Sequence, residues 1–447
     1  MPIPPELATA CADIREARDG DEIAGRRARY VAAPDSTEEA SALLRSAAAI
    51  GLTVVPRGAG RLQHWGNPPD SCDLIVDTRR LDRIVEHAPA DLTVTVQAGV
   101  LLRDLELALA PARQTVSLFP PKPAHAGTIG GLIAANVAGS HSYRFGTPRD
   151  RLTAITVVLA DGTIVTSDAD GGERDLITAL AGSFGSLGLI TEATFRLEPT
   201  PQIAGGMTLK CDDPEHAERL VQEVSDPWIA PSGIDLRWPS ADEQLRLIAM
   251  LQGDREDFNA RKARVCELAG REVPPPFDPA RARRLDDPDH GGLPPEMAEK
   301  LRAHGERIRA EIENPSPDTG TLVRVLSPAT RLAWTLTLIQ ATAADAGVQA
   351  AITGSAVTGV LDVAVGAETP NGAVARFVAA LRAGLGGLSQ PTTTTEAARA
   401  VVLYAPDDVR DLIDAHGPVP SLALLRAAKD EFDPEHRMAP GRLADAV

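Results

Sequence analysis

The sequence predicts an α+β fold in which helices and strands follow one another and glycine-rich loops stand at strand ends. Two observations predict it. An amphipathic helix pattern over 36–51 leads into the short apolar run 52–55, which ends in a glycine loop. Further apolar runs at 152–159 and 163–165 flank Asp161-Gly162, a dipeptide typical of a β-hairpin turn.

The first helix has clear signals at both ends. Ser36 can cap its start and Glu39 can reach back to Ser36, which together make a capping box. Gly51 is a suitable helix stop. Apolar runs predict strands at 52–55, 74–77, 84–86, 93–96, 152–159, 163–165, 189–197, 245–251 and 321–326, and helices at 101–109, 175–181, 297–312 and 421–432.

Composition divides the chain. It shifts after Pro199 and Pro201, which predicts a first domain over 25–200 and a second α+β domain over 201–405. Residues 254–320 are charged and proline-rich, and outside the helix at 297–312 we expect them to form a mobile insertion. The segment 406–447 is expected to return to the first domain, with Leu422, Leu425 and Phe432 as its packing residues.

Overall composition excludes some classes of protein. The 447 residues carry a net charge of −17 and only 3% aromatic side chains, which disfavours nucleic acid and anionic membranes as partners. No apolar run is long enough for a membrane span, and no signal peptide is evident. The four cysteines are scattered without a CxxC pair, which predicts a cytoplasmic location and no metal or iron–sulfur cluster held by this chain alone.

Three stretches of small residues point to one ligand. The longest stretch, 126–139, carries no charge. Its residues are mostly glycine, alanine and other small or apolar residues, and none has a side chain suited to acid–base chemistry. Loops 56–60 and 182–188 are similar. Such loops let a ligand lie against bare backbone, and unpaired amides within them suit phosphate oxygens. Three of them favour a long ligand such as a dinucleotide, although neither GxGxxG after a first strand nor a P-loop is present.

At these residues the chain resembles the FAD-binding domain shared by vanillyl-alcohol oxidase and p-cresol methylhydroxylase, and within that group the FAD-binding subunit of glycolate oxidase. The resemblance is strong over 25–200, weaker over 200–253 and 321–405, and returns at 432–434 and 440–442. The segments that carry it are 56–60, 65–66, 77–81, 96–99, 127–131, 134–136, 143–150 and 182–188.

The resemblance implies a set of FAD-binding residues. The first loop should wrap the pyrophosphate, the second stretch should lie against the pyrophosphate and ribityl chain and then the flavin ring, and the third should touch the adenine end. In that order the residues are Pro56, Arg57, Gly58, Ala59, Gly60, Arg61 and Leu62; Thr128, Ile129, Gly130, Gly131, Asn136 and Gly139, with Arg144 and Gly146 continuing the wall; and Gly188 and Ile190. For Arg57, a salt bridge to a neighbouring acid is the alternative.

FAD is expected to be bound non-covalently. Many members of the family attach it through a histidine directly after the first glycine loop, and this chain has Arg61 there. His64 lies three residues further on and is interpreted as a loop histidine beside Trp65.

The resemblance implies an FAD-dependent oxidoreductase that oxidises a small 2-hydroxy acid or alcohol by hydride transfer to flavin N5. One alternative is a non-catalytic FAD-binding subunit of a multi-subunit glycolate or 2-hydroxy-acid dehydrogenase, partnered by an electron-accepting iron–sulfur subunit. Another is a flavin-free scaffold that keeps the fold. The segment 167–175 departs from the family because it is shorter and lacks the lysine, asparagine and tyrosine found there.

The catalytic residues remain unknown from the sequence. A base would be expected to come from the second domain, and none of the candidates there, His216, His290, His304 and Tyr404, sits in a recognisable motif. His125 and His141 flank the longest small-residue stretch, and a structural role is the simpler interpretation for both.

Overall fold

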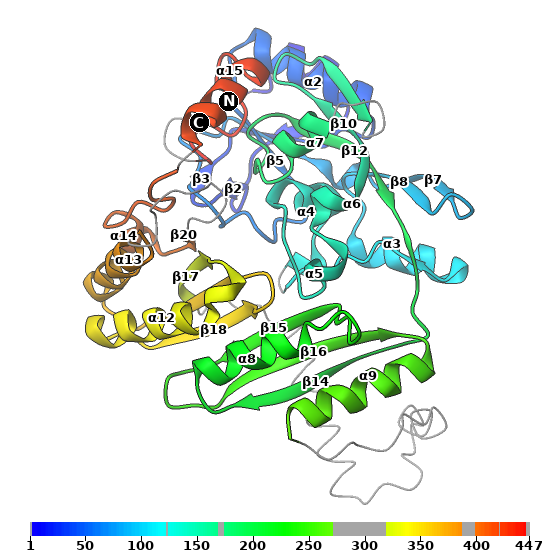
Figure 1. Ribbon diagram of the computed structural model, residues 1–447. Helices are drawn as coiled ribbons and strands as arrows, with labels where there is room; N and C mark the ends of the chain where they lie inside the picture. Colours follow the sequence, from blue (N-terminus) through cyan, green and yellow to red (C-terminus); the bar gives the residue numbers. More distant parts are fainter. Residues whose placement is uncertain are drawn as a thin grey trace, which may run out of the picture.

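The computed structural model describes residues 2–121, 124–168, 174–270, 319–386, 398–419 and 421–443. Three larger β-sheets with helices packed on them make up these residues, so the predicted α+β fold class is confirmed (Figure 1). Two sheets lie in the upper part of Figure 1 and the largest lies below them. The predicted helix 297–312 and most of the charged insertion lie outside the described residues.

The first sheet has strand order β1-β4-β6-β5, with parallel pairing among β4, β6 and β5. Helix α2 covers it because Leu43 and Leu44 pack with Leu74 and Val76 of β6 in one buried cluster. The elements here are α1 (Pro5–Ala10), β1 (Ile14–Glu16), β2 (Glu22–Ile23), β3 (Arg26–Arg27), β4 (Tyr30–Ala32), α2 (Thr37–Ala49), β5 (Val54–Arg57), β6 (Leu74–Asp77) and the 3-10 turn η1 (Thr78–Arg80).

The second sheet is antiparallel, with order β11-β10-β12-β8-β7. Gly162, with φ +87°, makes the predicted turn between β10 and β11. The elements are β7 (Ile84–Ala88), β8 (Thr93–Gln97), α3 (Leu102–Leu109), η2 (Ala110–Ala112), β9 (Gln114–Thr115), η3 (Ala124–Ala126), α4 (Ile129–Ala135), α5 (Ser142–Phe145), α6 (Pro148–Arg151), β10 (Leu152–Val158), β11 (Ile164–Asp168), α7 (Arg174–Leu180), β12 (Leu189–Arg196) and β13 (Glu198–Pro199).

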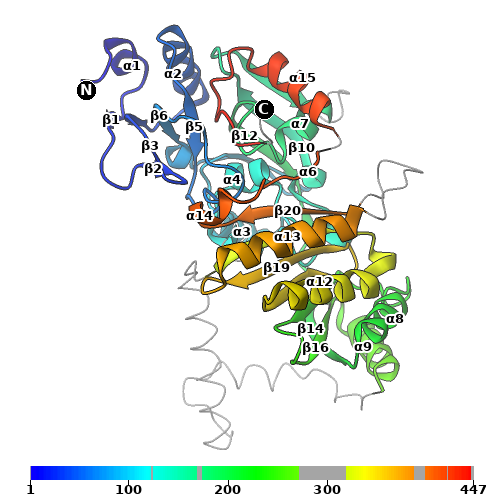
Figure 2. The ribbon, with the colours of Figure 1, turned by 90° about the vertical axis from the view of Figure 1, so that its left-hand side faces the viewer.

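The third sheet is also antiparallel, with order β14-β16-β15-β18-β19-β17-β20. Its helices lie on one face, where apolar side chains such as Leu236, Leu247 and Val323 form a buried cluster with theirs (Figures 1 and 2). The elements are β14 (Ile203–Cys211), α8 (Pro214–Val224), β15 (Gly233–Trp238), β16 (Leu245–Gly253), α9 (Arg255–Leu268), β17 (Thr319–Leu326), η4 (Ala329–Arg331), α12 (Leu332–Ala346), β18 (Ala350–Ser355), β19 (Val360–Gly366), α13 (Asn371–Gly386) and β20 (Arg399–Tyr404).

The other face of the third sheet meets the segment that follows α4. A Cβ atom added to Gly233 at the start of β15 would overlap the carbonyl oxygen of Ser140. The Arg324 guanidinium of β17 lies over the Trp65 ring, 5.1 Å from its centroid. These contacts place the third sheet against the part of the chain that carries the glycine loops.

The C-terminal segment lies beside the strand that leads into the first glycine loop. After α14 (Asp407–Arg410) and α15 (Leu422–Phe432), Met438 forms a parallel bridge with Val54 of β5. The Ala439 amide donates to the Val54 carbonyl at 2.8 Å. The segment therefore extends the first sheet next to residues 56–60.

Three predictions differ from the structure in detail. The stretch 255–268 was expected to be part of a mobile insertion, which is wrong, because α9 forms there and buries Phe258, Val265 and Cys266. Strand β15 has no counterpart in the predicted elements. The capping box is half formed: Ser36 Oγ accepts from the Glu39 amide at 3.3 Å, while the Glu39 carboxylate accepts from the amides of Ala12 and Asp35.

Candidate functional site

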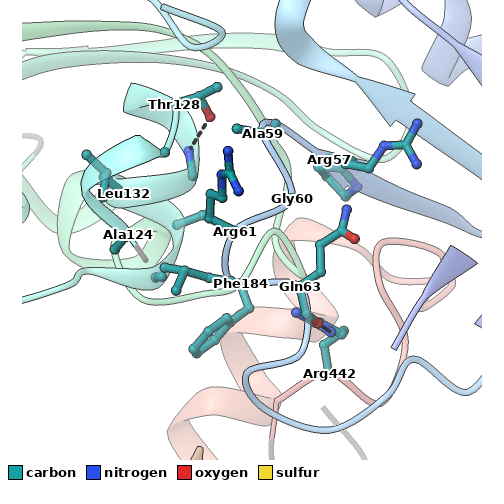
Figure 3. A pocket seen from close by; sticks show the side chains of 17 residues that line it. Arg57, Ala59, Gly60, Arg61, Gln63, Ala124, Thr128, Leu132, Phe184 and Arg442 are labelled. Atoms are coloured by element: carbon teal, nitrogen blue, oxygen red, sulfur yellow. Dashed lines mark hydrogen bonds between the residues drawn. The ribbon is translucent and has the colours of Figure 1, made fainter. Parts of the chain in front are cut away.

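A groove runs between the first glycine loop and α4. The loop forms one wall and the residues around α4 form the opposite wall, while Phe184 and Arg442 close one end (Figure 3). The lining residues are Pro56, Arg57, Gly58, Ala59, Gly60, Arg61, Leu62, Gln63, Ala124, Gly127, Thr128, Gly131, Leu132, Ala134, Ala135, Phe184 and Arg442.

A second cavity adjoins the groove and shares Pro56, Gly58 and Phe184 with it. Gly130, Gly188 and Ile190 form its walls together with Thr78 and Ala98. The two cavities together make an elongated site that touches all three small-residue stretches. That shape suits a long, extended ligand.

From Gly58 onward, the backbone amides of the first loop lack hydrogen-bond partners among the described residues. No amide from Gly58 to His64 donates a hydrogen bond to any described residue. A run of consecutive unpaired N–H groups in a turn is an anion-binding arrangement, because the donors converge on one concavity. The loop residues are half-buried or exposed, so their amides are open to an acceptor supplied from outside the chain.

The second stretch, at the start of α4, lines the site but offers no free backbone amide from Ile129 to Gly131. The expectation of unpaired amides at this helix start is therefore wrong. The Ile129 amide donates to Val100 O and the Gly130 amide to Ala98 O, both at 2.8 Å. The Gly131 amide donates to Thr128 Oγ1 at 3.3 Å (Figure 3). Phosphate oxygens would therefore be met by the first loop, and α4 would pack against the ligand.

Two glycines are required by close packing. A Cβ atom on Gly58 would overlap Thr128 Oγ1, and one on Gly130 would lie 2.7 Å from the Ala98 Cβ. Neither contact is compatible with a real side chain. The walls of the groove can approach each other this closely only because these positions lack side chains.

The cations around the groove differ in availability. The Arg57 guanidinium is paired with Asp21 at 3.4 Å and Asp77 at 3.3 Å, and it points away from the groove (Figure 3). The ion-pair alternative for Arg57 thus matches the structure. Arg61 points between Ala59 and Thr128 and has no ion pair with any described residue.

Arg442 is the buried cation of the site. Only 4% of it is exposed, it has no carboxylate partner among the described residues, and its Nε has no hydrogen-bond partner there. Its Nη1 donates to the carbonyl of Gln63 at 2.7 Å. Burial, together with nearby Arg410, lowers the pKa of Arg442 to about 10. A buried guanidinium without an acid beside it is suited to an anionic ligand.

The structure brings most of the sequence-predicted residues together but not all. The residues that line the two cavities are Pro56, Arg57, Gly58, Ala59, Gly60, Arg61, Leu62, Thr128, Gly130, Gly131, Gly188 and Ile190. Ile129 is fully buried in the core, Asn136 caps α4 with φ +42° and accepts from the Arg149 amide, and Gly139 lines a different cavity. Arg144 is exposed over Phe145, and Gly146 ends α5, so neither lines the two cavities.

Sequence reasoning missed several lining residues. Phe184 and Gly185 lie inside the run 182–188, which the sequence already indicated as part of the ligand site. Arg442 lies in the Pro440-Gly441-Arg442 segment, where the resemblance to the FAD family reappears. The neighbouring sequence gave no indication that its side chain lines the groove. Thr78, Ala98 and Gln63 reach the site only through the packing of distant elements.

A third cavity lies between the segment after α4 and the open face of the third sheet, with about 1450 Å³ of space. Gly139, Ser140 and Ser142 form one side, and strands β15, β17, β18 and β19 form the other. Asp235 of β15 accepts a 2.5 Å hydrogen bond from the Ser140 hydroxyl. Burial raises the pKa of Asp235.

None of the sequence-predicted base candidates that the structure describes lines this third cavity. His216 lies on α8 beside Asp212, and Tyr404 packs edge-on against the His64 ring. The His141 ring packs on Phe119 with centroids 4.0 Å apart, and burial lowers its pKa to about 4. His290, His304 and the side chain of His125 lie outside the described residues.

Comparison with known proteins points to a cofactor for the groove. Residues 28–168 match the family model of the FAD binding domain. The match covers about a third of the chain. The matched segment forms most of the two cavities, and later parts of the chain add Phe184, Gly185, Gly188, Leu189, Ile190 and Arg442. The free amides of the first loop fit the pyrophosphate of FAD, so the geometry and the family agree on the cofactor.

Curated relatives share the region of the FAD binding domain. The chain is 31% identical to the glycolate oxidase subunit GlcD of Bacillus subtilis over 212 residues, which is 46% of this chain and 44% of that protein. It is 32% identical to the D-lactate dehydrogenase of Archaeoglobus fulgidus (44% of each chain) and 27% identical to that of Anaerostipes hadrus (61% of this chain, 56% of the other). The chain thus spans about half the length of the curated relatives it matches.

Among solved structures, alkyldihydroxyacetonephosphate synthase superposes over 93% of this chain and 77% of its own, with a TM-score of 0.63 and 16% identity. At that identity the likeness concerns the fold alone. Within the described residues no helix is long and apolar enough to cross a membrane. The same residues hold no cluster of His, Cys, Asp and Glu suited to a metal ion.

Proposed function

We propose that this chain is an FAD-dependent oxidoreductase that oxidises a small 2-hydroxy acid or alcohol. The observation that supports FAD as the cofactor is the run of unpaired amides from Gly58 to His64, in a loop that lines a groove within the segment matching the FAD binding domain. The proposed substrate class rests on the relatives named glycolate oxidase subunit GlcD and D-lactate dehydrogenase.

In this proposal the chain's residues hold and orient the cofactor. The amides of 58–64 bind the pyrophosphate, and Arg61 and Arg442 balance its charge. Gly58, Gly130 and Gly131 let the walls close on it, and Gly188 and Ile190 contact the adenine end. FAD, when bound without a covalent link, supplies the two-electron acceptor for a hydride from the substrate.

The third sheet supplies the substrate side. We assign residues 201–405 to a cap domain and the segment 406–447 to the FAD binding domain, on which α15 and Met438 pack. The cavity between Ser140 and β15 is then the place where substrate meets cofactor. We also retain the cytoplasmic location that the scattered cysteines predict.

Anaerobic flavin bleaching tests this function. The chain is purified, loaded with FAD and mixed with glycolate, D-lactate or L-lactate, with propionate as the control because it lacks the hydroxyl group. Loss of the oxidised-flavin absorption band with a hydroxy acid but not with propionate is expected. A chain that holds FAD but is bleached only in the presence of a separate catalytic or iron–sulfur subunit would instead be the non-catalytic member of such a complex.

A further inference from the structure

The open face of the third sheet carries a polar pattern that the pairing register defines. Side chains alternate between the two faces of a strand, and directly paired residues share a face. Asp235 and Arg237 of β15 are two residues apart, so they lie on the same face. Asp235 pairs with Ser355 of β18, and Arg237 pairs with Thr353. All four line the cavity beside Ser140.

We propose that β15 supplies the two groups that recognise a 2-hydroxy acid: Arg237 binds the substrate carboxylate, and Asp235, positioned by Ser140, accepts the proton of the substrate hydroxyl. The proposal rests on the proposed function and names the residues of its substrate site.

Asp235 has the contacts expected of a general base that a neighbouring residue holds in position. Its Oδ2 accepts from the Ser140 hydroxyl at 2.5 Å, and its Oδ1 has no hydrogen-bond partner among the described residues. The Ser140 bond fixes the carboxylate, because Ser140 is itself held by close packing of its carbonyl on Gly233. Oδ1 is therefore a buried acceptor without a partner in the described part of the chain, on a residue that lines the cavity beside Ser140.

Arg237 is the cation of this cavity that is available to a ligand. The other guanidinium in the cavity, Arg324, forms two hydrogen bonds with the Asp362 carboxylate at 2.8 and 2.9 Å. Arg237 is exposed and has no ion pair with any residue in the described part of the chain. A guanidinium fits a carboxylate with two parallel hydrogen bonds.

The register also places further cations beside Arg237. Arg246 of β16 pairs with Arg237, and Lys210 of β14 pairs with Arg246, so these three cations form a row on one face, which we call the basic row. All three are exposed. On a chain with net charge −17, a local cationic row draws small anions toward the cavity.

The charged and titratable groups near Asp235 favour its role. Arg237 on the same strand lowers its pKa, Ser140 donates to it, and Ser355 and Ile248 lie opposite it on the neighbouring strands. Asp362, the other acid of the cavity, is neutralised by Arg324. His141 follows Ser140, but its ring packs on Phe119. Burial outweighs the two lowering contacts, so the pKa of Asp235 is raised, which strengthens it as a base.

The reaction balances with FAD as oxidant. Asp235 would take the hydroxyl proton, and bound FAD would supply the acceptor for the hydrogen and electron pair of the C–H bond as the C–O bond becomes a carbonyl. The products would be a 2-oxo acid, FAD reduced by two electrons and a protonated Asp235, whose proton would then pass to solvent.

The test uses the FAD-loaded chain and two variants with matched controls. Asp235→Asn is compared with Asp242→Asn, an exposed acid between β15 and β16, and Arg237→Met with Arg219→Met, an exposed cation on α8. Two quantities are measured: binding of oxalate, a dicarboxylate that cannot donate a hydride, by calorimetry, and the rate of flavin reduction by the best 2-hydroxy acid.

Asp235→Asn is expected to slow flavin reduction by about 100-fold or more, as loss of a general base does, while oxalate still binds. The wild-type rate should fall as pH drops through the pKa of Asp235, and the variant should lose that dependence. Arg237→Met should weaken oxalate binding by about tenfold or more. The control variants should match the wild type in both measurements, and all variants should retain FAD.

The outcomes separate the two claims. Wild-type reduction rates in Asp235→Asn, or unchanged oxalate binding in Arg237→Met, would overturn the assignment of these residues and leave the proposed function in place. A wild-type chain that holds FAD but is reduced by no 2-hydroxy acid would overturn the proposed function, and with it the role of Asp235.

Discussion

Lys429 and Asp433 form an ion pair in which Nζ and Oδ2 are 2.7 Å apart, and both side chains are fully buried. Nζ also donates to the carbonyls of Ser186 and Met438, each at 2.7 Å. One ammonium group thus joins α15 to the third glycine run and to the residue that bridges β5. The C-terminal segment holds two of the walls of the proposed FAD site in place.

Replacement of Lys429 by Met should destabilise the fold strongly. It leaves the Asp433 carboxylate buried without its cation, and loss of one partner of a buried pair costs about 3–5 kcal/mol. Urea denaturation followed by circular dichroism measures the free energy of unfolding. Arg426→Met, at an exposed position one turn earlier on α15, is the control and should change it by less than about 0.5 kcal/mol. Equal values for the two variants would contradict the role given to Lys429.

His141 should make the fold sensitive to mild acid. Burial lowers the pKa of its ring from 6.5 to about 4, so between these two pH values the unfolded chain binds a proton that the folded chain does not. Stability is therefore lost as pH falls through this window, by about 3 kcal/mol in total. His141→Phe, which keeps a ring against Phe119, should remove this part of the pH dependence of the unfolding free energy. A variant with an unchanged pH profile would show that His141 is not responsible.

Arg442 should matter for cofactor affinity. A hydrogen bond to a charged group contributes about 1.5–3 kcal/mol, so Arg442→Met should raise the Kd for FAD by about tenfold or more. Arg442→Lys should lose less because it keeps the charge. Arg144→Met is the informative control, since Arg144 was predicted from sequence to contact FAD but lies outside both cavities. If Arg144→Met weakens FAD binding as much as Arg442→Met, the flavin extends beyond the groove described above.

FAD should leave the chain when the protein is denatured. The position where many members of the family carry an attachment histidine holds Arg61, which cannot form that bond, and His64 packs its ring against Tyr404. Acid precipitation of the yellow protein should therefore release the colour into the supernatant. A yellow pellet, with a flavin-labelled peptide after digestion, would show a covalent link.

Local patterns were sufficient where an element depends on its own residues. Strand β6 has the predicted bounds Leu74–Asp77, because four consecutive apolar or buried residues suit a strand covered on both faces. The Asp161-Gly162 turn was predicted because it needs only a residue that tolerates positive φ. The glycine loops were found for the same reason.

Features that depend on distant partners were not predictable. The pairing of the Ile129 and Gly130 amides with Val100 and Ala98 is set by tertiary packing, and so is the position of Arg442 at the groove. Helix α9 was missed because it is charged and buries only Phe258, Val265 and Cys266, too few for a clear periodicity. On α15 the apolar pattern indicated Leu422, Leu425 and Phe432. Phe432 packs against the core cluster that includes the second sheet, but the buried residue is Lys429, whose ammonium pairs with Asp433 and also donates to the distant carbonyl of Ser186.

The most direct test of the account is a titration of the flavin-free chain with FAD, followed by quenching of flavin fluorescence or by calorimetry. The wild-type chain should bind one FAD per chain. Gly130→Val, whose side chain would collide with Ala98 in the wall of the site, should bind at least about tenfold more weakly, while Gly366→Ala, where a Cβ atom meets nothing within 4 Å, should bind as the wild type does. A wild-type chain that binds no FAD, or a Gly130→Val chain that binds it unchanged, would contradict the assignment of this groove as the flavin site.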